Sequence, residues 1–339
     1  MDRFKSPRTL VMIALAFVYL VGFPFYFQDS NYLLGIVIVA SILSCISLGV
    51  WLTFSIGRIN IGQGAFAAIG GYTTAILSVK LGVSFWLCLP LSGVVATVVG
   101  LLIGIPILRL RGVYFAMITL CLTEAVTLFL LNAEKLTQGA SGIMNIPRPG
   151  ALAIAGVTII PAFKPGHYLY FYFLTAFLLL IVLAGLWRLN TSRIGWIFRA
   201  LRQSDTLARS IGVNIVKYRL IAYGICCFMG GIGGSLFTVS MQNMFPSSFR
   251  VTDSVYFMLY CFLGGLDYLF GPVVGAFLLT GSFELLRAVQ KYQEGIYACL
   301  MIALMLWLPN GILSLRFRRR ISKERVGNRF FKVLGLSRD

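Results

Sequence analysis

Long apolar stretches alternate with short polar ones along almost the whole chain. A helix needs about 20 apolar residues to cross the hydrocarbon core of a bilayer. The pattern predicts ten such helices, at 9–27, 31–56, 64–79, 84–108, 112–131, 168–188, 218–241, 252–266, 271–289 and 295–313. We therefore expect an all-α, polytopic protein that lies in the lipid bilayer.

Composition supports a membrane protein. The chain is 58% hydrophobic and 12% charged, with a mean hydropathy of +0.87, whereas soluble domains carry about 25% charged residues. The formal charge of +18 could indicate nucleic acid. However, the basic residues fall in short loops and in the tail, where they act as a topology signal. We expect no nucleic-acid partner.

The basic residues also predict the orientation, because Lys and Arg accumulate in cytoplasmic loops. With both termini in the cytoplasm, 22 of the 29 basic residues lie inside. Twenty of them fall in segments 1–8, 57–63, 109–111, 189–217, 267–270 and 314–339, and the other two are Arg188 and Arg219, at the ends of the spans that flank 189–217. The sequence thus predicts a transmembrane domain over 1–315, which includes the cytoplasmic loop 189–217, and a basic cytoplasmic tail over 316–339.

Two of the predicted spans are short and interrupted by glycine. These are 64–79 and 252–266, and each is third in its half if the chain is cut into two five-helix halves. Because five is odd, the halves would have opposite orientations. Short segments at matching positions indicate an inverted repeat around a central translocation path. Between the halves, the prolines and glycines of 132–167 exclude a continuous helix, and we expect an outer hairpin within 151–163.

Motifs of enzymes are absent from the sequence. There is no phosphate-binding GxxxxGK[ST] loop, no Ser/His/Asp set and only one histidine, His167. The seven cysteines lie in apolar stretches without a CxxC pair, which favours a packing role over metal ligation. We expect no enzymatic activity, no cofactor and no metal. The energy for any transport must then come from an ion gradient or from a separate ATPase subunit.

Two glycine-rich segments differ in their surroundings. Gly230–Gly234 lies within an apolar span, where small residues let helices approach closely. Gly57–Phe66 contains three glycines among polar residues just before a short span. Two interpretations are open for it: an ordinary tight cytoplasmic turn, or a non-helical backbone that is buried in protein or lines a water-filled cavity.

Glu124 is the acid that lies deep within a predicted span. A charged residue at this depth faces the bundle interior or a cavity. Three roles are open: a protonated structural hydrogen-bonding group, a residue of a translocation path, or a proton relay. A proton-driven transporter would usually contain more than one such group, which disfavours the relay.

The basic loop between Arg188 and Arg219 contains seven basic residues and the single acid Asp205. Helical spacing predicts an amphipathic helix over 197–211, and Gly212 follows as a stop. Its apolar face is formed by Ile197, Leu201, Ala208 and Ile211. This helix could lie on anionic lipid or insert into a cleft of a soluble partner.

Six motifs, in order, resemble the permease family of branched-chain amino acid ABC importers, in particular the second of its two paralogous permease types. They span roughly residues 31–313 and comprise Asn60–Phe66 with Ile69–Tyr72, Arg109–Ala116 with Thr119, Leu120 and Glu124, Thr137–Ile143, Arg199–Tyr218, Gly264–Leu266 with Gly271 and Pro272, and Pro309–Leu313. Relatives of this type transport branched-chain amino acids, urea, short amides or aromatic acids.

The resemblance implies an inner-membrane permease subunit of a bacterial ABC importer. Its partners would be a paralogous permease, two ATP-binding subunits and a periplasmic solute-binding protein. The basic loop would couple to the ATPase through Arg199, Leu201, Arg202, Asp205, Ala208, Ile211 and Gly212. The translocation path would contain Asn60, Gln63, Tyr72, Thr119 and Glu124. The alternative is a self-sufficient secondary transporter that is driven by an ion gradient.

Overall fold

The computed structural model describes most of the chain between residues 30 and 287. The described residues are 19, 30–110, 112–150, 152–154, 157–160, 168–210, 212–287, 292, 295–296, 298–299, 302–303, 306 and 311–313. The predicted span 9–27 lies almost entirely outside them, as do much of the span 295–313, the tail 316–339, His167 and Ile211.

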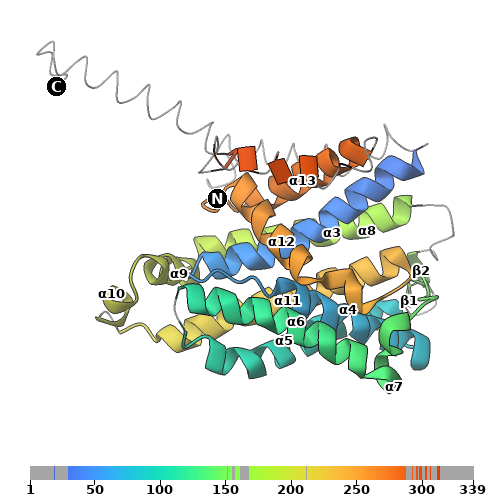
Figure 1. The fold of residues 1–339 in the computed structure, drawn as a ribbon, viewed down its shortest axis with the longest axis horizontal. Coiled ribbons are helices and arrows are strands. Elements are labelled where there is room, and N and C mark those ends of the chain that lie inside the picture. Colours follow the sequence, from blue (N-terminus) through green and yellow to red (C-terminus); the bar gives the residue numbers. More distant parts are fainter. Residues whose placement is uncertain are drawn as a thin grey trace, which may run out of the picture.

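The described part of the chain folds as a bundle of helices (Figure 1). The helices are α3 (Asn31–Phe54), α4 (Gln63–Lys80), α5 (Phe85–Ile107), α6 (Val113–Asn132), α7 (Glu134–Thr137), α8 (Leu169–Thr191), α9 (Arg193–Gln203), α10 (Asp205–Ser210), α11 (Ile215–Met241), α12 (Val251–Gly264) and α13 (Gly271–Leu285), with 3-10 turns η3 (Gly139–Ser141) and η4 (Pro246–Phe249). The exception is a hairpin of β1 (Leu152–Ile154) and β2 (Val157–Ile160), which pair antiparallel. The hairpin predicted within 151–163 is thus confirmed.

Helix lengths agree with the predicted spans where the chain is described. Five helices, α3, α5, α6, α8 and α11, are 20 to 27 residues long and apolar enough to cross a membrane, while the apolar helix α13 has only 15 residues. The two spans predicted to be short are the helices α4, with 18 residues, and α12, with 14. The total of ten helices and the inverted repeat stay predictions.

Helix α11 lies at the centre of the bundle and packs against α3, α4 and α5. Its glycine run allows close approach, as predicted. A Cβ atom on Gly234 would lie 1.9 Å from the carbonyl oxygen of Ala67 in α4, and one on Gly70 would lie 2.3 Å from the carbonyl oxygen of Gly231. No real Cβ tolerates such distances, so at Gly70 and Gly234 the close approach of α4 and α11 requires glycine.

The segments that connect the long helices lie at the two ends of the bundle. Figure 1 shows α9 and α10 at one end and α7 with the hairpin at the other. At the first end, Arg202 forms an ion pair with Asp267, and a Cβ atom on Gly57 would lie 3.3 Å from Cα of Arg202. At the second end, Lys80 donates to the carbonyl oxygen of Leu136. The segments 57–63, 189–217 and 267–270, which the predicted topology places together, therefore do meet. That this end is cytoplasmic stays a prediction.

Candidate functional site

Residues 57–62, here called the α4 approach, run into the bundle without helical structure. The side chains of Arg58 and Asn60 are buried. The first residue of α4, Gln63, contacts Ile46, which lies eight residues before the end of α3. At 1.5 Å per residue, α4 therefore begins about 12 Å inside the bundle. This geometry favours a non-helical backbone buried in protein over an exposed turn.

Two amide side chains at the start of α4, Asn60 and Gln63, are bound by the chain itself. Gln63 Nε2 donates to the carbonyl oxygens of Ile46 (3.1 Å) and Cys226 (3.0 Å). Gln63 Oε1 accepts from Cys226 Sγ (2.9 Å) and from Asn60 Nδ2 (3.3 Å). Because buried polar groups are costly unless they are hydrogen-bonded, this network fixes the start of α4 between α3 and α11. Asn60 and Gln63, two of the predicted path residues, thus hold helices together.

Thr119 and Tyr72, two further predicted path residues, are also buried. Thr119 Oγ1 accepts from the backbone N–H of Ile61 (3.1 Å), which ties α6 to the α4 approach. Tyr72 lies in the main hydrophobic core, and its Oη has no hydrogen-bond partner among the described residues. Neither side chain lines the cavity that opens between α6 and the segment 246–252.

Residues 242–250, here called the α12 approach, lead to a second helix that starts inside the bundle. Ser254, in the first turn of α12, accepts through Oγ from the backbone N–H of Gly64 (2.9 Å). It also lies 3.3 Å from Thr123 Oγ1 of α6. The starts of α4 and α12 therefore meet directly. From this meeting point α4 runs to the end that contains Lys80, and α12 runs to the end that contains Asp267.

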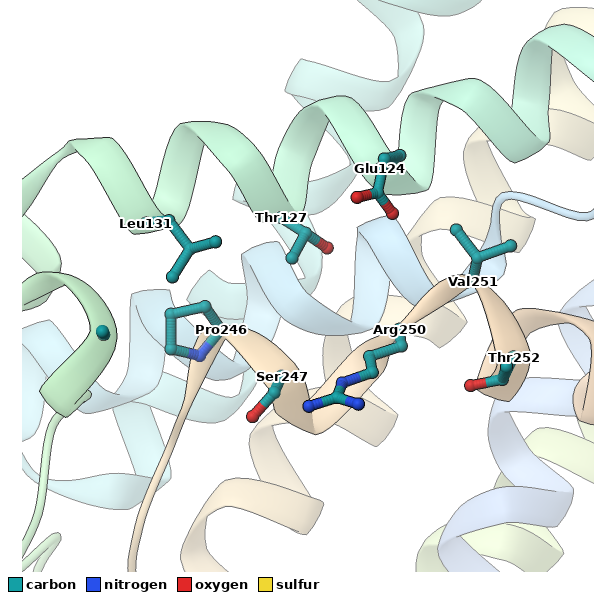
Figure 2. Close-up of a pocket in the computed structure, with 9 residues that line it drawn as sticks. Glu124, Thr127, Leu131, Pro246, Ser247, Arg250, Val251 and Thr252 are labelled. Atoms are coloured by element: carbon teal, nitrogen blue, oxygen red, sulfur yellow. The ribbon is translucent and has the colours of Figure 1, made fainter.

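A cavity of about 500 Å³ opens beside this meeting point, between α6 and the α12 approach (Figure 2). It is lined by Glu124, Thr127, Leu131, Ala140, Pro246, Ser247, Arg250, Val251 and Thr252. Figure 2 shows Glu124 and Thr127 projecting from α6 toward the segment that carries Arg250. Of the five predicted path residues, Glu124 alone lies in this cavity.

Two opposite charges face the cavity without neutralising each other. Glu124 and Arg250 are both exposed, and they form no ion pair with each other within 4 Å. The carboxylate of Glu124 makes no hydrogen bond to a described residue, so no described contact supports the role of a protonated structural hydrogen-bonding group. Sequence reasoning counted Arg250 only as an outer basic residue. The signal it missed was Asp253 three residues later, whose carboxylate caps the start of α12 at Arg250.

The basic loop contains two helices where one was predicted. Helix α9 ends at Gln203, and Ser204 takes an extended conformation (φ −160°, ψ 122°) before α10. Ser204 Oγ accepts weakly from the backbone N–H of Leu207 (3.4 Å), in the manner of an N-cap. The prediction of a continuous helix over 197–211 is therefore wrong. The stop at Gly212 is confirmed, since its φ of +81° is a left-handed conformation that favours glycine.

The apolar face of this loop turns inward. Leu201 and Ala208 are 3% and 1% exposed, and they form a small cluster with Ile215 at the start of α11. They are therefore not available as a contact face for a partner, and this part of the prediction is corrected. Helical spacing identified an apolar face, but this chain's own α11 covers it. Among the described residues of the loop, the large apolar side chains that are exposed are Trp196, Leu207 and Val216.

The charged residues of the loop attach it to the bundle. Asp205 accepts from Arg219 of α11 in an ion pair whose side chains are 17% and 9% exposed. Arg202 pairs with Asp267 (2.8 Å) and lies over the ring of Phe54, 4.7 Å from its centroid. Arg199 stacks on Trp196 at 4.2 Å. The predicted coupling residues Arg202 and Asp205 thus link α9 and α10 to α3, α11 and the α12–α13 turn.

Comparisons with known proteins agree with this architecture. Residues 32–308 match the family described as branched-chain amino acid transport system / permease component. The chain is 32% identical over 322 residues to the high-affinity branched-chain amino acid transport system permease proteins LivM of Salmonella typhimurium and Escherichia coli, covering 91% of this chain and 75% of each relative.

A more distant relative is the Methanocaldococcus jannaschii protein named "Probable branched-chain amino acid transport permease protein LivH", which is 25% identical over 302 residues, 84% of this chain and 92% of that protein. No solved structure matches the chain. The apolar helices and the match over most of the chain locate the protein in a membrane. This chain therefore belongs to the family of permease components of branched-chain amino acid transport systems.

Proposed function

We propose that this chain is a membrane-spanning permease subunit of an ABC importer in a bacterial inner membrane. It would carry a branched-chain or related amino acid from a periplasmic binding protein to the cytoplasm, with both termini on the cytoplasmic side. The observation that carries the proposal is the family match over residues 32–308. Because proteins named LivM and LivH both match this one chain, a paralogous permease is the natural partner.

The paired starts of α4 and α12 support an inverted repeat. Each helix follows an approach without α-helical structure, although the α12 approach contains the 3-10 turn η4, and the two helices run from their meeting point to opposite ends of the bundle. Their neighbours correspond as well, since α4 packs against α5 as α12 packs against α13, and α11 packs against α5 as α3 packs against α13. Discontinuous helices at matching places are typical of transporters with inverted repeats. We place the translocation path at the cavity of Glu124, beside this meeting point.

The basic loop would couple the permease to two ATP-binding subunits. Our proposed contact face differs from the one that helical spacing suggests, because Leu201 and Ala208 are buried. It consists of the exposed outer face of α10, which presents Leu207 (68% exposed) between Thr206 and Arg209. A displacement of this face would be transmitted to α11 through the ion pair of Asp205 with Arg219. It would be transmitted to the α12–α13 turn through the ion pair of Arg202 with Asp267.

Reconstitution tests the proposed function against a secondary transporter. The chain would be co-purified with a paralogous permease, an ATPase and a binding protein of the same organism and placed in proteoliposomes. We expect uptake of labelled leucine that requires both ATP and the binding protein. Uptake by this chain alone under an imposed proton or sodium gradient, without ATP, would instead favour the secondary transporter.

The contact face has its own test in Leu207→Asp. A charge at the centre of a desolvated contact costs about 1–3 kcal/mol or more, so we expect loss of ATPase co-purification by tenfold or more while membrane insertion stays normal. Arg193→Gln, an exposed residue at the far end of α9, is the matched control and should have little effect. Normal co-purification of Leu207→Asp would refute this face.

A further inference from the structure

The cavity between α6 and the α12 approach presents one positive and one negative side chain from different elements. Arg250 precedes α12 and Glu124 lies at the middle of α6, and both line the same space of about 500 Å³. Small-molecule sites have volumes of about 300–1,000 Å³. Ionisable residues at membrane depth are costly and mark substrate pathways. Two opposite charges that stay unpaired beside each other indicate a ligand that carries both charges.

The positive side of the cavity consists of more than one group. The guanidinium of Arg250 makes no hydrogen bond or ion pair to another described residue. Its positive charge does attract the carboxylate of Asp253 electrostatically. The carboxylate of Asp253 is engaged by the backbone N–H of Arg250 (2.8 Å). Val251 and Thr252, the first two residues of α12, also line the cavity. Their N–H groups belong to the unpaired donors of a helix start, whose partial positive charge favours an anion.

The negative side is formed by Glu124, with Thr127 one turn further along α6. Thr127 Oγ1 donates its hydrogen to the carbonyl oxygen of Thr123 (3.0 Å), so only its lone pairs face the cavity. Both groups can therefore accept hydrogen bonds from a cation, and neither needs one from the protein. Apolar side chains complete the lining at Leu131, Pro246 and Val251.

We propose that this cavity binds the zwitterionic head group of an aliphatic α-amino acid. Arg250 and the start of α12 would bind the carboxylate, and Glu124 would accept from the ammonium group. The aliphatic side chain would contact Leu131, Pro246 and Val251. This assignment rests on the proposed function and deepens it, because it selects α-amino acids over urea, simple amides and aromatic acids, none of which carries both charges.

A cysteine in the cavity wall reports on occupancy directly. Ser247 is exposed and lines the cavity, and serine to cysteine is a small change. Of the chain's own described cysteines, Cys121 and Cys299 are exposed and the other five are buried, so Cys121→Ser and Cys299→Ser suffice as a background. The full chain carrying Ser247→Cys, in complex with its partner permease in nanodiscs, would be reacted with a small polar thiol reagent.

We expect leucine to slow labelling of Ser247→Cys by about tenfold at saturation, while leucinamide, which lacks the carboxylate, and 4-methylpentanoate, which lacks the amine, slow it far less. Adding Glu124→Gln or Arg250→Gln should raise the leucine concentration needed for protection by about tenfold or more, the effect of losing a charged hydrogen bond. Glu134→Gln and Arg287→Gln remove the same charges at exposed positions outside the cavity and should leave protection unchanged.

Each failure has a separate meaning. Equal protection by leucine and leucinamide, or unchanged protection in Arg250→Gln, would overturn the carboxylate site. Equal protection by 4-methylpentanoate, or unchanged protection in Glu124→Gln, would overturn the ammonium site. If reconstituted complexes import leucine with ATP but leucine does not protect Ser247→Cys, the inference fails and the proposed function stands. If no ATP-dependent uptake of any amino acid is found, the proposed function itself fails.

Discussion

The starts of α4 and α12 occupy equivalent positions in the bundle but are built in opposite ways. The start of α4 is closed: Asn60 and Gln63 are buried, and their amide groups are hydrogen-bonded within the chain. The α12 approach is open: Arg250 faces a cavity and has no side-chain partner among the described residues. Two helix starts at equivalent positions therefore serve two purposes. One start fixes the helices relative to each other, and the other leaves charges available.

Gln63→Leu should remove the hydrogen-bond network at the start of α4 and give the largest loss of stability. Leucine has a similar volume, but it removes the acceptor for Asn60 Nδ2 and Cys226 Sγ and the donor to two carbonyl oxygens. Unsatisfied buried groups cost about 1–3 kcal/mol each, so we expect a loss of about 3 kcal/mol in the free energy of unfolding.

The measurement is the melting temperature of the purified chain, followed by the loss of its monodisperse peak in size-exclusion chromatography. Gln203→Leu, at the exposed end of α9, makes the same chemical change where water can replace the lost hydrogen bonds. If both variants melt at the same temperature, the amide network at the start of α4 does not stabilise the fold.

Ser254→Ala should have an intermediate effect, since Ser254 joins the two starts. The substitution removes the acceptor for the Gly64 N–H and leaves this buried donor unpaired, at a cost of about 1–2 kcal/mol. We expect a smaller fall in melting temperature than for Gln63→Leu. Ser254→Thr keeps the hydroxyl group and should recover part of the loss, whereas equal melting of the alanine and threonine variants would argue against the hydrogen bond.

Arg250→Gln should have the smallest effect on stability. Exposed side chains without partners usually contribute within about 0.5 kcal/mol, so the variant should melt like the unmodified chain. A fall comparable to that of Gln63→Leu would mean that Arg250 holds the fold together, and the contrast between the two starts would disappear.

The sequence was sufficient for features that depend on spacing and backbone. Hydropathy located the long helices, and glycines located the short helices α4 and α12 and the close packing of α11. The sequence was insufficient where the result depended on which part of the chain, or which partner, covers an apolar helix face. Leu201 and Ala208 show the periodicity of an apolar face, but periodicity is the same whether a partner or the chain's own Ile215 covers it. Arg250 counted as a loop charge because only the folded α12 approach brings it beside Glu124.

The two attachments of the α12–α13 turn differ in permanence. Trp51 Nε1 donates to the carbonyl oxygen of Leu266 (2.9 Å) from a buried indole, which anchors one side of the turn to α3. The ion pair of Asp267 with Arg202 is solvent-exposed, with side chains 73% and 36% exposed, and such pairs contribute about 0–1 kcal/mol. Thermal motion alone can open and re-form this second attachment. The turn therefore stays attached to α3 through Trp51 when the ion pair opens. Helix α9 can then separate from the turn without disturbing the packing of the membrane-spanning helices.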